Sequence, residues 1–423
     1  MFYVGLINIF FIFALSLAKP IYVSRKLGLD YVNPITIISV SYLPILSMQI
    51  LGGPAYILDD GISNVWFNLA LVMQALSLSI EFLVVVIFLN ILIKTPVVSN
   101  TINNLLIPRF IPKKGRMIFL SLALYFLAFF FLALVAQHSF GVLNWIRDPR
   151  AGYMLGRSGA GQYYAFAILF LTVGYVIGTF FSRRTSSLFL YFFVAEIFGW
   201  FSASKGIILS FAVYFLIVVK IKAPWYFNRI LILIIPILTL LVLSAFGSVE
   251  LQDIFEYFDY YPNSAMFYQS YFRGDLRLFM GDIFLTDFWG YLPRSLFPDK
   301  PYVYGTLLLN EYFFPGAAEL GHTPAFGGPV SAFADFGLVG VIFSALFCGS
   351  QLVWVFANYV IFFKNKTLNN DSRMLVCFLV NFAPVLFIYF QTIWSLILFF
   401  ILIFILKFVN GVVVARERKE SFR

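Results

Sequence analysis

The sequence predicts an all-α polytopic membrane protein with about eleven transmembrane helices. The first observation is composition: 61% of the residues are hydrophobic, 20% are aromatic and only 12% are charged, whereas roughly a quarter of the residues in soluble proteins are charged. The second is a series of apolar runs long enough to cross a bilayer, which takes about 20 residues. The third is the spacing of Lys and Arg, which gather in alternate loops between these runs.

The apolar runs divide the chain into one transmembrane domain over residues 1–423 with two notable loops. One loop, 137–162, is short, and the other, 249–330, is rich in aromatics, glycines and prolines. Since the long loop is too aromatic for a disordered segment, we expect it to fold. The predicted spans are 2–18, 35–51, 65–93, 117–137, 163–182, 188–204, 206–219, 230–248, 331–360, 374–391 and 394–410.

The basic residues predict the orientation of the chain. When the loops alternate between sides, 21 of the 29 Lys and Arg residues fall on one side, which the positive-inside rule makes the cytoplasm. The N-terminus and both notable loops are then outside, and the C-terminus is inside. The net charge of +9 therefore reflects membrane topology and does not indicate nucleic-acid binding. The first apolar run lacks a cationic start and is followed by Lys19, so we interpret it as an uncleaved anchor.

Eight basic residues lie on the outer side, against this trend. Lys205 is in a tight turn, where snorkelling to the lipid headgroups is an alternative explanation. The other seven are in the two notable loops: Arg147, Arg150, Arg157, Arg273, Arg277, Arg294 and Lys300. The apolar spacing over 271–284 predicts a helix along the outer membrane surface, with Arg273 and Arg277 on a neighbouring face.

The motifs of several enzyme classes are absent from the sequence. It has no phosphate-binding GxxxxGK[ST], dinucleotide-binding glycine fingerprint, CxxC, HExxH or GxSxG pattern. Its two histidines are too few for a histidine-rich metal centre, and its two cysteines fall in or next to predicted spans. What remains is a group of arginines beside a membrane. Arginine stays charged and pairs bidentately with phosphate oxygens, so the group suits a lipid-linked phosphate or pyrophosphate. The alternatives are contact with lipid headgroups or pairing with nearby acids: Asp148, Asp275, Asp282 and Asp299.

Three segments carry a resemblance to a known family: Arg273 to Gly340, the Tyr153…Arg157-Ser-Gly-Ala-Gly stretch and the Ser204-Lys205-Gly206 turn. Together with the number of spans and the late outer loop, they resemble the Wzy-type O-antigen and oligosaccharide repeat-unit polymerases. The O-antigen ligases share this architecture. The resemblance implies a GT-C-like fold in the bacterial inner membrane, with the outer side facing the periplasm. It also implies a metal-independent glycosyltransferase without cofactors, which moves a growing glycan from undecaprenyl pyrophosphate onto the next lipid-linked repeat unit.

On this reading the arginines stabilise the charge that builds on the leaving pyrophosphate. The predicted pyrophosphate contacts are Arg157, Arg273, Arg277, Arg294, Lys205, Arg147 and Arg150, with Arg273 also catalytic. His322 and Glu319, three residues apart, are candidates to accept the acceptor's proton or to orient the sugar. Asp335 is expected to cap the start of the ninth span, with catalysis as an alternative. A chain-length regulator protein is a further partner that the resemblance implies.

Two acids lie inside predicted spans, Glu81 in the third and Glu196 in the sixth. An unpaired charge is costly there, so each should face a partner or a cavity. Proton transfer and helix locking are both open, and locking is favoured.

Other functions stay open at this point. Asp59 and Asp60 suggest a metal-dependent lipid-phosphate-sugar transferase, because divalent ions prefer carboxylate oxygens. A second alternative function is transport of lipid-linked oligosaccharides, although the sequence shows no repeated halves of the kind that transporters commonly have. A ligase differs only in its acceptor.

Overall fold

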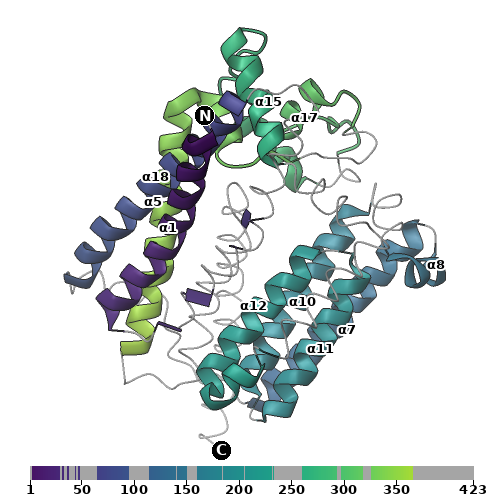
Figure 1. The fold of residues 1–423 in the computed structure, drawn as a ribbon. Coiled ribbons are helices and arrows are strands. Elements are labelled where there is room, and N and C mark those ends of the chain that lie inside the picture. Colours follow the sequence, from purple (N-terminus) through teal and green to yellow (C-terminus); the bar gives the residue numbers. More distant parts are fainter. Residues whose placement is uncertain are drawn as a thin grey trace, which may run out of the picture.

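The computed structural model is helical throughout the part of the chain that it describes, and it contains no strand there (Figure 1). The described residues are 2–28, 31–32, 36–37, 43, 46–47, 64–94, 114–139, 141–149, 160–182, 184–203, 205–230, 232, 260–292, 297–317 and 325–364.

A first bundle consists of α1 (Phe2–Leu27), α5 (Asn64–Lys94) and α18 (Val330–Lys364). Both α1 and α18 pack against α5, and Figure 1 shows the three helices side by side. Small residues allow the close approach of α18 to α5. A Cβ on Gly349 would lie only 2.8 Å from Cβ of Val84. Because the glycine has no such atom, the Val84 side chain of α5 packs directly against the backbone of α18.

A second bundle consists of α7 (Lys114–Ser139), α10 (Gly161–Phe181), α11 (Thr185–Phe201) and α12 (Lys205–Lys222). The short α8 (Val142–Arg147) follows α7 at one end of this bundle (Figure 1). The most extensive packing is between α7 and α10, and α11 packs against both α10 and α12. The core is aromatic and aliphatic.

Glycines again set the distance between helices in the second bundle. A Cβ on Gly178 would lie 2.3 Å from the Tyr191 ring and 2.6 Å from Oγ of Ser121. Ser121 donates a hydrogen bond of 2.6 Å to the carbonyl oxygen of Gly174. A hydroxyl that bonds across two helices satisfies its polar atom without water, as an apolar environment requires.

Apart from the first, the predicted spans agree with the helices wherever the structure describes them. Among the described residues, five helices are long and apolar enough to cross a membrane: 7–27, 65–91, 117–139, 161–179 and 330–350. Two shorter apolar helices, 185–201 and 206–220, match the sixth and seventh predicted spans. The described part of the chain is thus all-helical, and its apolar helices are consistent with a polytopic membrane protein. The spans predicted at 374–391 and 394–410, and most of 35–51 and 230–248, lie outside the described residues. The total of eleven helices, the GT-C-like fold and the orientation stay predictions.

The first span differs from its prediction. It was expected to end at residue 18, with Lys19 in a loop, but α1 continues to Leu27 and has Pro20 inside it. Lys19 is therefore a helical residue, and an ion pair to α5 allows it to stay there. The basic residues in the last turn of α1 are instead Arg25 and Lys26.

The long loop folds against the first bundle. Its helices are α15 (Tyr260–Arg273), α16 (Asp282–Thr286), the 3-10 helix η2 (Asp287–Tyr291) and α17 (Leu307–Phe313). Figure 1 shows α15 and α17 at the end of the bundle where the N-terminus lies. The loop shares one core with the bundle. Its buried members include Ile12, Phe67, Leu71, Tyr261, Ala265, Phe267, Tyr268 and Phe333.

The single helix predicted over 271–284 is wrong. The helix α15 lies earlier and ends at Arg273, where Gly274 has a positive φ of 86°. Met280 and Gly281 also have positive φ, at 53° and 103°. A continuous helix cannot contain these left-handed residues, so the segment turns before α16 begins. The apolar spacing reflects contact with the loop core and with α18, not one helical face.

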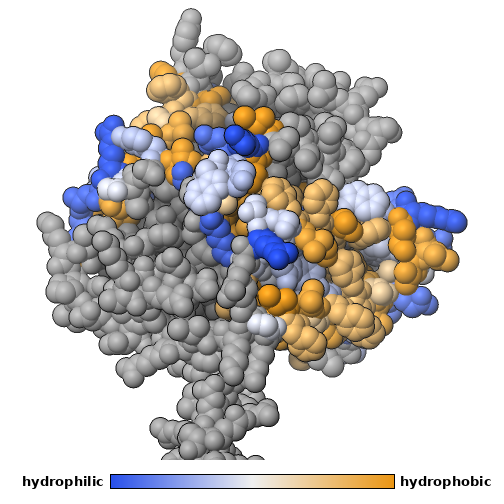
Figure 2. Space-filling model, turned by 90° about the horizontal axis from the view of Figure 1, so that it is seen from below, coloured by the Kyte–Doolittle hydropathy of each residue, from blue (hydrophilic) through white to orange (hydrophobic). Residues whose placement is uncertain are grey.

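The outer surface agrees with a membrane location. Viewed from below, much of the described surface is hydrophobic, and the hydrophilic residues form separate patches (Figure 2). Large exposed hydrophobic side chains occur along α1, α5, α7, α11 and α18. In water such a surface would be unusual for a monomer, whereas acyl chains cover it in a bilayer.

Candidate functional site

The start of α15 is joined to the segment before α18. The side-chain amide of Asn263 donates to the carbonyl oxygen of Ala325 at 2.8 Å, and the backbone N–H of Gly327 donates to Tyr260 at 2.8 Å. The hydroxyl of Ser264 lies 2.8 Å from the carbonyl oxygen of Gly327. These contacts fix the chain just after the predicted Glu319 and His322 pair, which lies outside the described residues.

Gly327 is needed at this junction. A Cβ there would lie 2.9 Å from the ring of Tyr261, which is almost fully buried and has no room to move. The polar groups of Asn263 and Ser264 are buried as well, and both have partners. Sequence reasoning missed this junction. The adjacent Asn and Ser near the start of an otherwise aromatic helix were the available signal.

Arg273 and Arg277 lie close together in the chain at the end of α15, and both are exposed. With its amide oxygen facing the guanidinium group, Gln269 accepts hydrogen bonds of 2.8 Å from both terminal nitrogens of Arg273. Neither arginine pairs with a carboxylate among the described residues. The alternative that Asp275, Asp282 or Asp299 neutralises these arginines is therefore wrong. Their charges are available to a ligand.

Asp335 holds the loop to α18. One of its carboxylate oxygens accepts from the backbone N–H groups of Gly281 at 3.1 Å and Ile283 at 3.0 Å, and the other accepts from Phe284 at 2.7 Å. The expectation that Asp335 caps its own helix is wrong, because it caps α16. Three accepted hydrogen bonds occupy this buried carboxylate, which argues for a positioning role and against a catalytic base.

Lys300 and Arg147 are held in different surroundings. Lys300 is buried, donates to the carbonyl oxygen of Leu292 at 3.0 Å and lies 4.6 Å from the centre of the Tyr304 ring. Arg147 is exposed at the end of α8, which Figure 1 shows well apart from α15. Arg147 therefore does not lie beside Arg273.

The remaining predicted site residues are not described. Lys205 begins α12, but its side chain is outside the described set. The residues whose placement is not described are Arg150, Arg157, Arg294, Glu319, His322, Asp59 and Asp60. Across the described part of the chain, no cluster of three or more His, Cys, Asp or Glu residues has the arrangement of a metal site.

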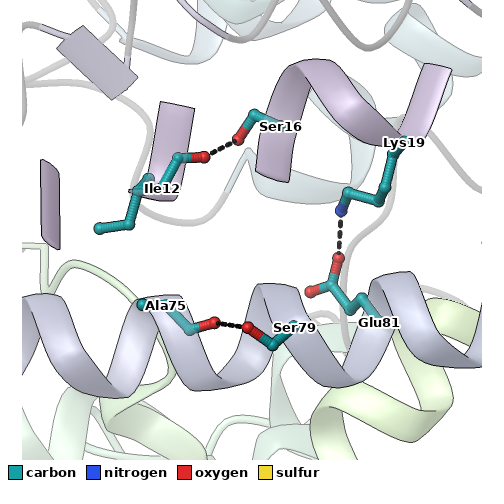
Figure 3. A network of polar contacts seen from close by, with 6 residues as sticks. All are labelled: Ile12, Ser16, Lys19, Ala75, Ser79 and Glu81. Atoms are coloured by element: carbon teal, nitrogen blue, oxygen red, sulfur yellow. Dashed lines mark hydrogen bonds and ion pairs between the residues drawn. The ribbon is translucent and has the colours of Figure 1, made fainter. Parts of the chain in front are cut away.

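Glu81 has the partner that its position demanded. Lys19 Nζ lies 2.7 Å from Glu81 Oε2, and the two side chains are only 12% and 14% exposed. In Figure 3 the two side chains point at each other from α1 and α5, while Ser16 and Ser79 bond back to their own helices. Each charged residue lies 17 positions after the first residue of its helix. The similar distance of Lys19 and Glu81 from the starts of their apolar runs was the feature of the sequence that could have indicated the pair.

Glu196 has no such partner. It is buried in α11, and neither carboxylate oxygen has a hydrogen-bond partner in the part of the chain that the structure describes. Nearby, Tyr175 donates to the carbonyl oxygen of Phe211 at 3.2 Å, and the hydroxyls of Thr179 and Tyr214 lie 3.2 Å apart. The second bundle thus holds a small set of buried polar groups next to its acid.

Comparison with known proteins identifies two curated relatives, each named O-antigen polymerase, from Salmonella typhimurium and Salmonella typhi. Each is 28% identical to this chain over 290 residues, which cover 64% of this chain and 67% of the relative. The chain is a relative of the O-antigen polymerases. The resemblance stated from the sequence is confirmed. No protein-family model matches the chain, and no solved structure matches it.

Proposed function

We propose that the protein polymerises oligosaccharide repeat units that are linked to undecaprenyl pyrophosphate, at the periplasmic face of the bacterial inner membrane. The growing glycan moves from its lipid carrier onto the next lipid-linked repeat unit, and undecaprenyl pyrophosphate is released. The O-antigen polymerase relatives support a role in O-antigen polymerisation. The membrane helices support lipid-borne substrates. A glycosyltransferase-type enzyme follows from the relationship.

The reaction forms one bond and breaks another. The acceptor hydroxyl attacks the anomeric carbon of the donor glycan, and the bond from that carbon to the pyrophosphate oxygen breaks. The hydroxyl proton goes to a base, and the electron pair of the broken bond stays on the pyrophosphate. Negative charge therefore grows on the leaving group in the transition state. Cationic donors that are already in place stabilise this charge without a metal ion.

The single structural observation that carries the proposal is the state of Arg273 and Arg277. Arg273 is exposed at the end of α15, Arg277 is exposed four residues further on, and neither is neutralised by a described carboxylate. Guanidinium groups in this state suit bidentate contact with pyrophosphate oxygens. We assign Arg273 to catalysis as well. The further proposed pyrophosphate contacts are Arg157, Arg294, Lys205 and Arg150, and the proposed proton acceptors or sugar contacts are His322 and Glu319. Arg147, which the sequence also suggested, lies apart from Arg273 and is not assigned to this contact.

The test is a reaction of purified protein in detergent with undecaprenyl-pyrophosphate-linked repeat units and EDTA, followed on a gel. A ladder of glycans is expected. Arg273→Ala and Arg277→Ala should each remove it, because the leaving group loses a cation. Arg184→Ala is the matched control, since Arg184 is an exposed arginine at the start of α11. Unchanged ladders from both loop variants would refute the role of these arginines.

Each competing function has its own outcome in the same assay. Transfer only after lipid A core is supplied would indicate a ligase. A ladder that EDTA abolishes, and that Asp60→Ala also abolishes, would indicate the metal-dependent transferase. Movement of the intact lipid-linked unit across vesicles with no new glycosidic bond would indicate a transporter.

A further inference from the structure

The short helices α16 and η2, together with Met280 just before them, carry large apolar side chains that are exposed in the described structure. Ile283 points into the loop core and is buried. On other sides of the same segment the large side chains are exposed, with Met280 at 75% and Leu285 at 65%. Phe284 and Phe288 are about half exposed. We call these four residues, Met280, Phe284, Leu285 and Phe288, the α16 face.

The segment that bears the α16 face is fixed rigidly to the top of α18. Asp335 accepts hydrogen bonds from three of its backbone N–H groups. The N–H of Phe279 donates to the carbonyl oxygen of Ala334 at 2.9 Å. That carbonyl lies just before the break in α18 at Gly337, whose φ of 62° and ψ of −147° are not helical. The α16 face therefore has a set position relative to the transmembrane helix.

The exposed face of α18 continues into the α16 face. Val339 and Phe343 are exposed one turn apart on α18, Phe343 at 68%, and Phe347 follows after another turn. These residues belong to a candidate span, so acyl chains cover them. Above them Phe336 is also exposed, and its ring would be 3.3 Å from a Cβ on Gly281. The apolar surface runs from the span through Phe336 to the segment that holds the α16 face.

Polar groups border the α16 face in the way that an interfacial segment requires. Arg277 and Asp282 are exposed immediately before the face and at the start of α16. Trp289 is half-buried at the other end, with its ring 4.7 Å from that of Phe288. Large apolar side chains flanked by Trp and Arg are typical of segments that lie at a membrane surface.

We infer that the α16 face inserts into the outer leaflet of the bilayer, so that the loop is docked on lipid and Arg277 lies at the level of the phosphates. The occupant is the membrane lipid, because the face continues the lipid-covered surface of α18. The inference does not depend on the proposed reaction. The loop then lies at the membrane surface and does not extend freely into the aqueous phase.

The test measures the immersion depth of single nitroxide labels in vesicles that contain only this protein. Cys348 and Cys377 are first replaced by serine. Labels are then placed by Leu285→Cys and Phe288→Cys, with Phe343→Cys as the lipid reference and Asp299→Cys as the water reference in the same loop. Accessibility to oxygen relative to a water-soluble nickel complex should be several-fold higher at 285 and 288 than at 299, and close to that at 343.

If the ratio of oxygen to nickel accessibility at positions 285 and 288 matches that at position 299, the inference is overturned. The same result is expected if another protein, and not lipid, covers the α16 face in the cell. Because a label at a half-exposed phenylalanine can disturb packing, Met280→Cys supplies a second position that is already 75% exposed. Each variant is accepted only if it remains monodisperse in detergent. Loss of polymerase activity alone would not bear on the result, since the readout is depth.

Discussion

The two helical bundles each contain one acidic residue deep in an apolar helix, and they accommodate it differently. In the first bundle Glu81 pairs with Lys19 across two helices. In the second bundle Glu196 is buried with both oxygens unpartnered among the described residues. The first bundle is therefore joined by a charge pair at depth, and the second by aromatic packing and single hydroxyl bonds. The effect of replacing a buried acid on stability therefore depends on whether a neighbouring helix supplies a cationic partner.

The largest effect is expected from breaking the pair on one side only. Lys19→Met or Glu81→Gln leaves the other charge in an apolar surrounding, which should lower the free energy of unfolding by about 3 kcal/mol. The double variant Lys19→Met/Glu81→Leu should recover most of the loss. The loss of stability is measured as a lower unfolding temperature, with thermal unfolding monitored by size-exclusion chromatography in detergent. Lys26→Met, at an exposed position of the same helix, is the control. Single variants as stable as the parent would show that the pair is unimportant.

The corresponding change in the second bundle sharpens the contrast. Glu196→Gln keeps the shape and removes an acid that has no cationic partner to leave behind. Its unfolding temperature should stay equal to that of the parent or rise slightly, in contrast to Glu81→Gln. A loss as large as that of Glu81→Gln would reveal a cationic partner for Glu196 in the rest of the chain.

The next effect concerns the loop, which only the first bundle carries. Asp335→Ala removes the acceptor for three backbone N–H groups of the α16 segment, at a cost of about 2 to 3 kcal/mol in the stability of the docked loop. Hydrogen exchange should rise at residues 279–286 while α7 and α10 stay protected. Equal exchange in the variant and the parent would mean that other contacts hold the loop.

Two glycines, one in the junction of the loop and one in the second bundle, provide a smaller, matched comparison. Gly327→Ala places a Cβ against the buried Tyr261 ring and should cost about 1 to 3 kcal/mol. Gly206→Ala in α12 has no heavy atom within 4 Å of the new Cβ and should cost nothing. Unfolding temperature and protease cleavage of the loop distinguish the two. Similar behaviour of both variants would contradict the tight junction at Gly327.

The smallest effect is a pH dependence confined to the loop. Burial raises the pKa of Asp287 above its usual 3.8. The Asp287 carboxyl therefore binds its proton more tightly in the folded loop than in the unfolded chain. The stability of the loop then falls as the pH rises from the pKa of Asp287 in the unfolded chain through its raised pKa in the folded loop. Asp287→Asn should flatten this part of the profile, measured as protease resistance against pH. An unchanged profile would assign the dependence to another group.

Periodicity and composition predicted the fold class well, and they failed where tertiary contacts compete. The apolar runs at 65–93, 117–137 and 163–182 became helices because hydrocarbon leaves the backbone no other way to satisfy its polar groups. The run at 271–284 met no such constraint. There glycines with positive φ and the carboxylate of Asp335 on another helix shaped the chain, and helical spacing alone did not reveal them.

The sequence by itself determined that this is a helical membrane protein, that its unusual cations collect in two segments between apolar runs, and that it is related to the O-antigen polymerases. These follow from local composition and from short motifs, which do not depend on which helix packs beside which. Only the tertiary structure showed that Lys19 forms an ion pair with Glu81 and that Asp335 accepts hydrogen bonds from the backbone of α16. It also showed that Arg273 and Arg277 have no carboxylate partner among the described residues. Such facts depend on contacts between residues far apart in the chain, and hydrophobic spacing carries no information about those distances.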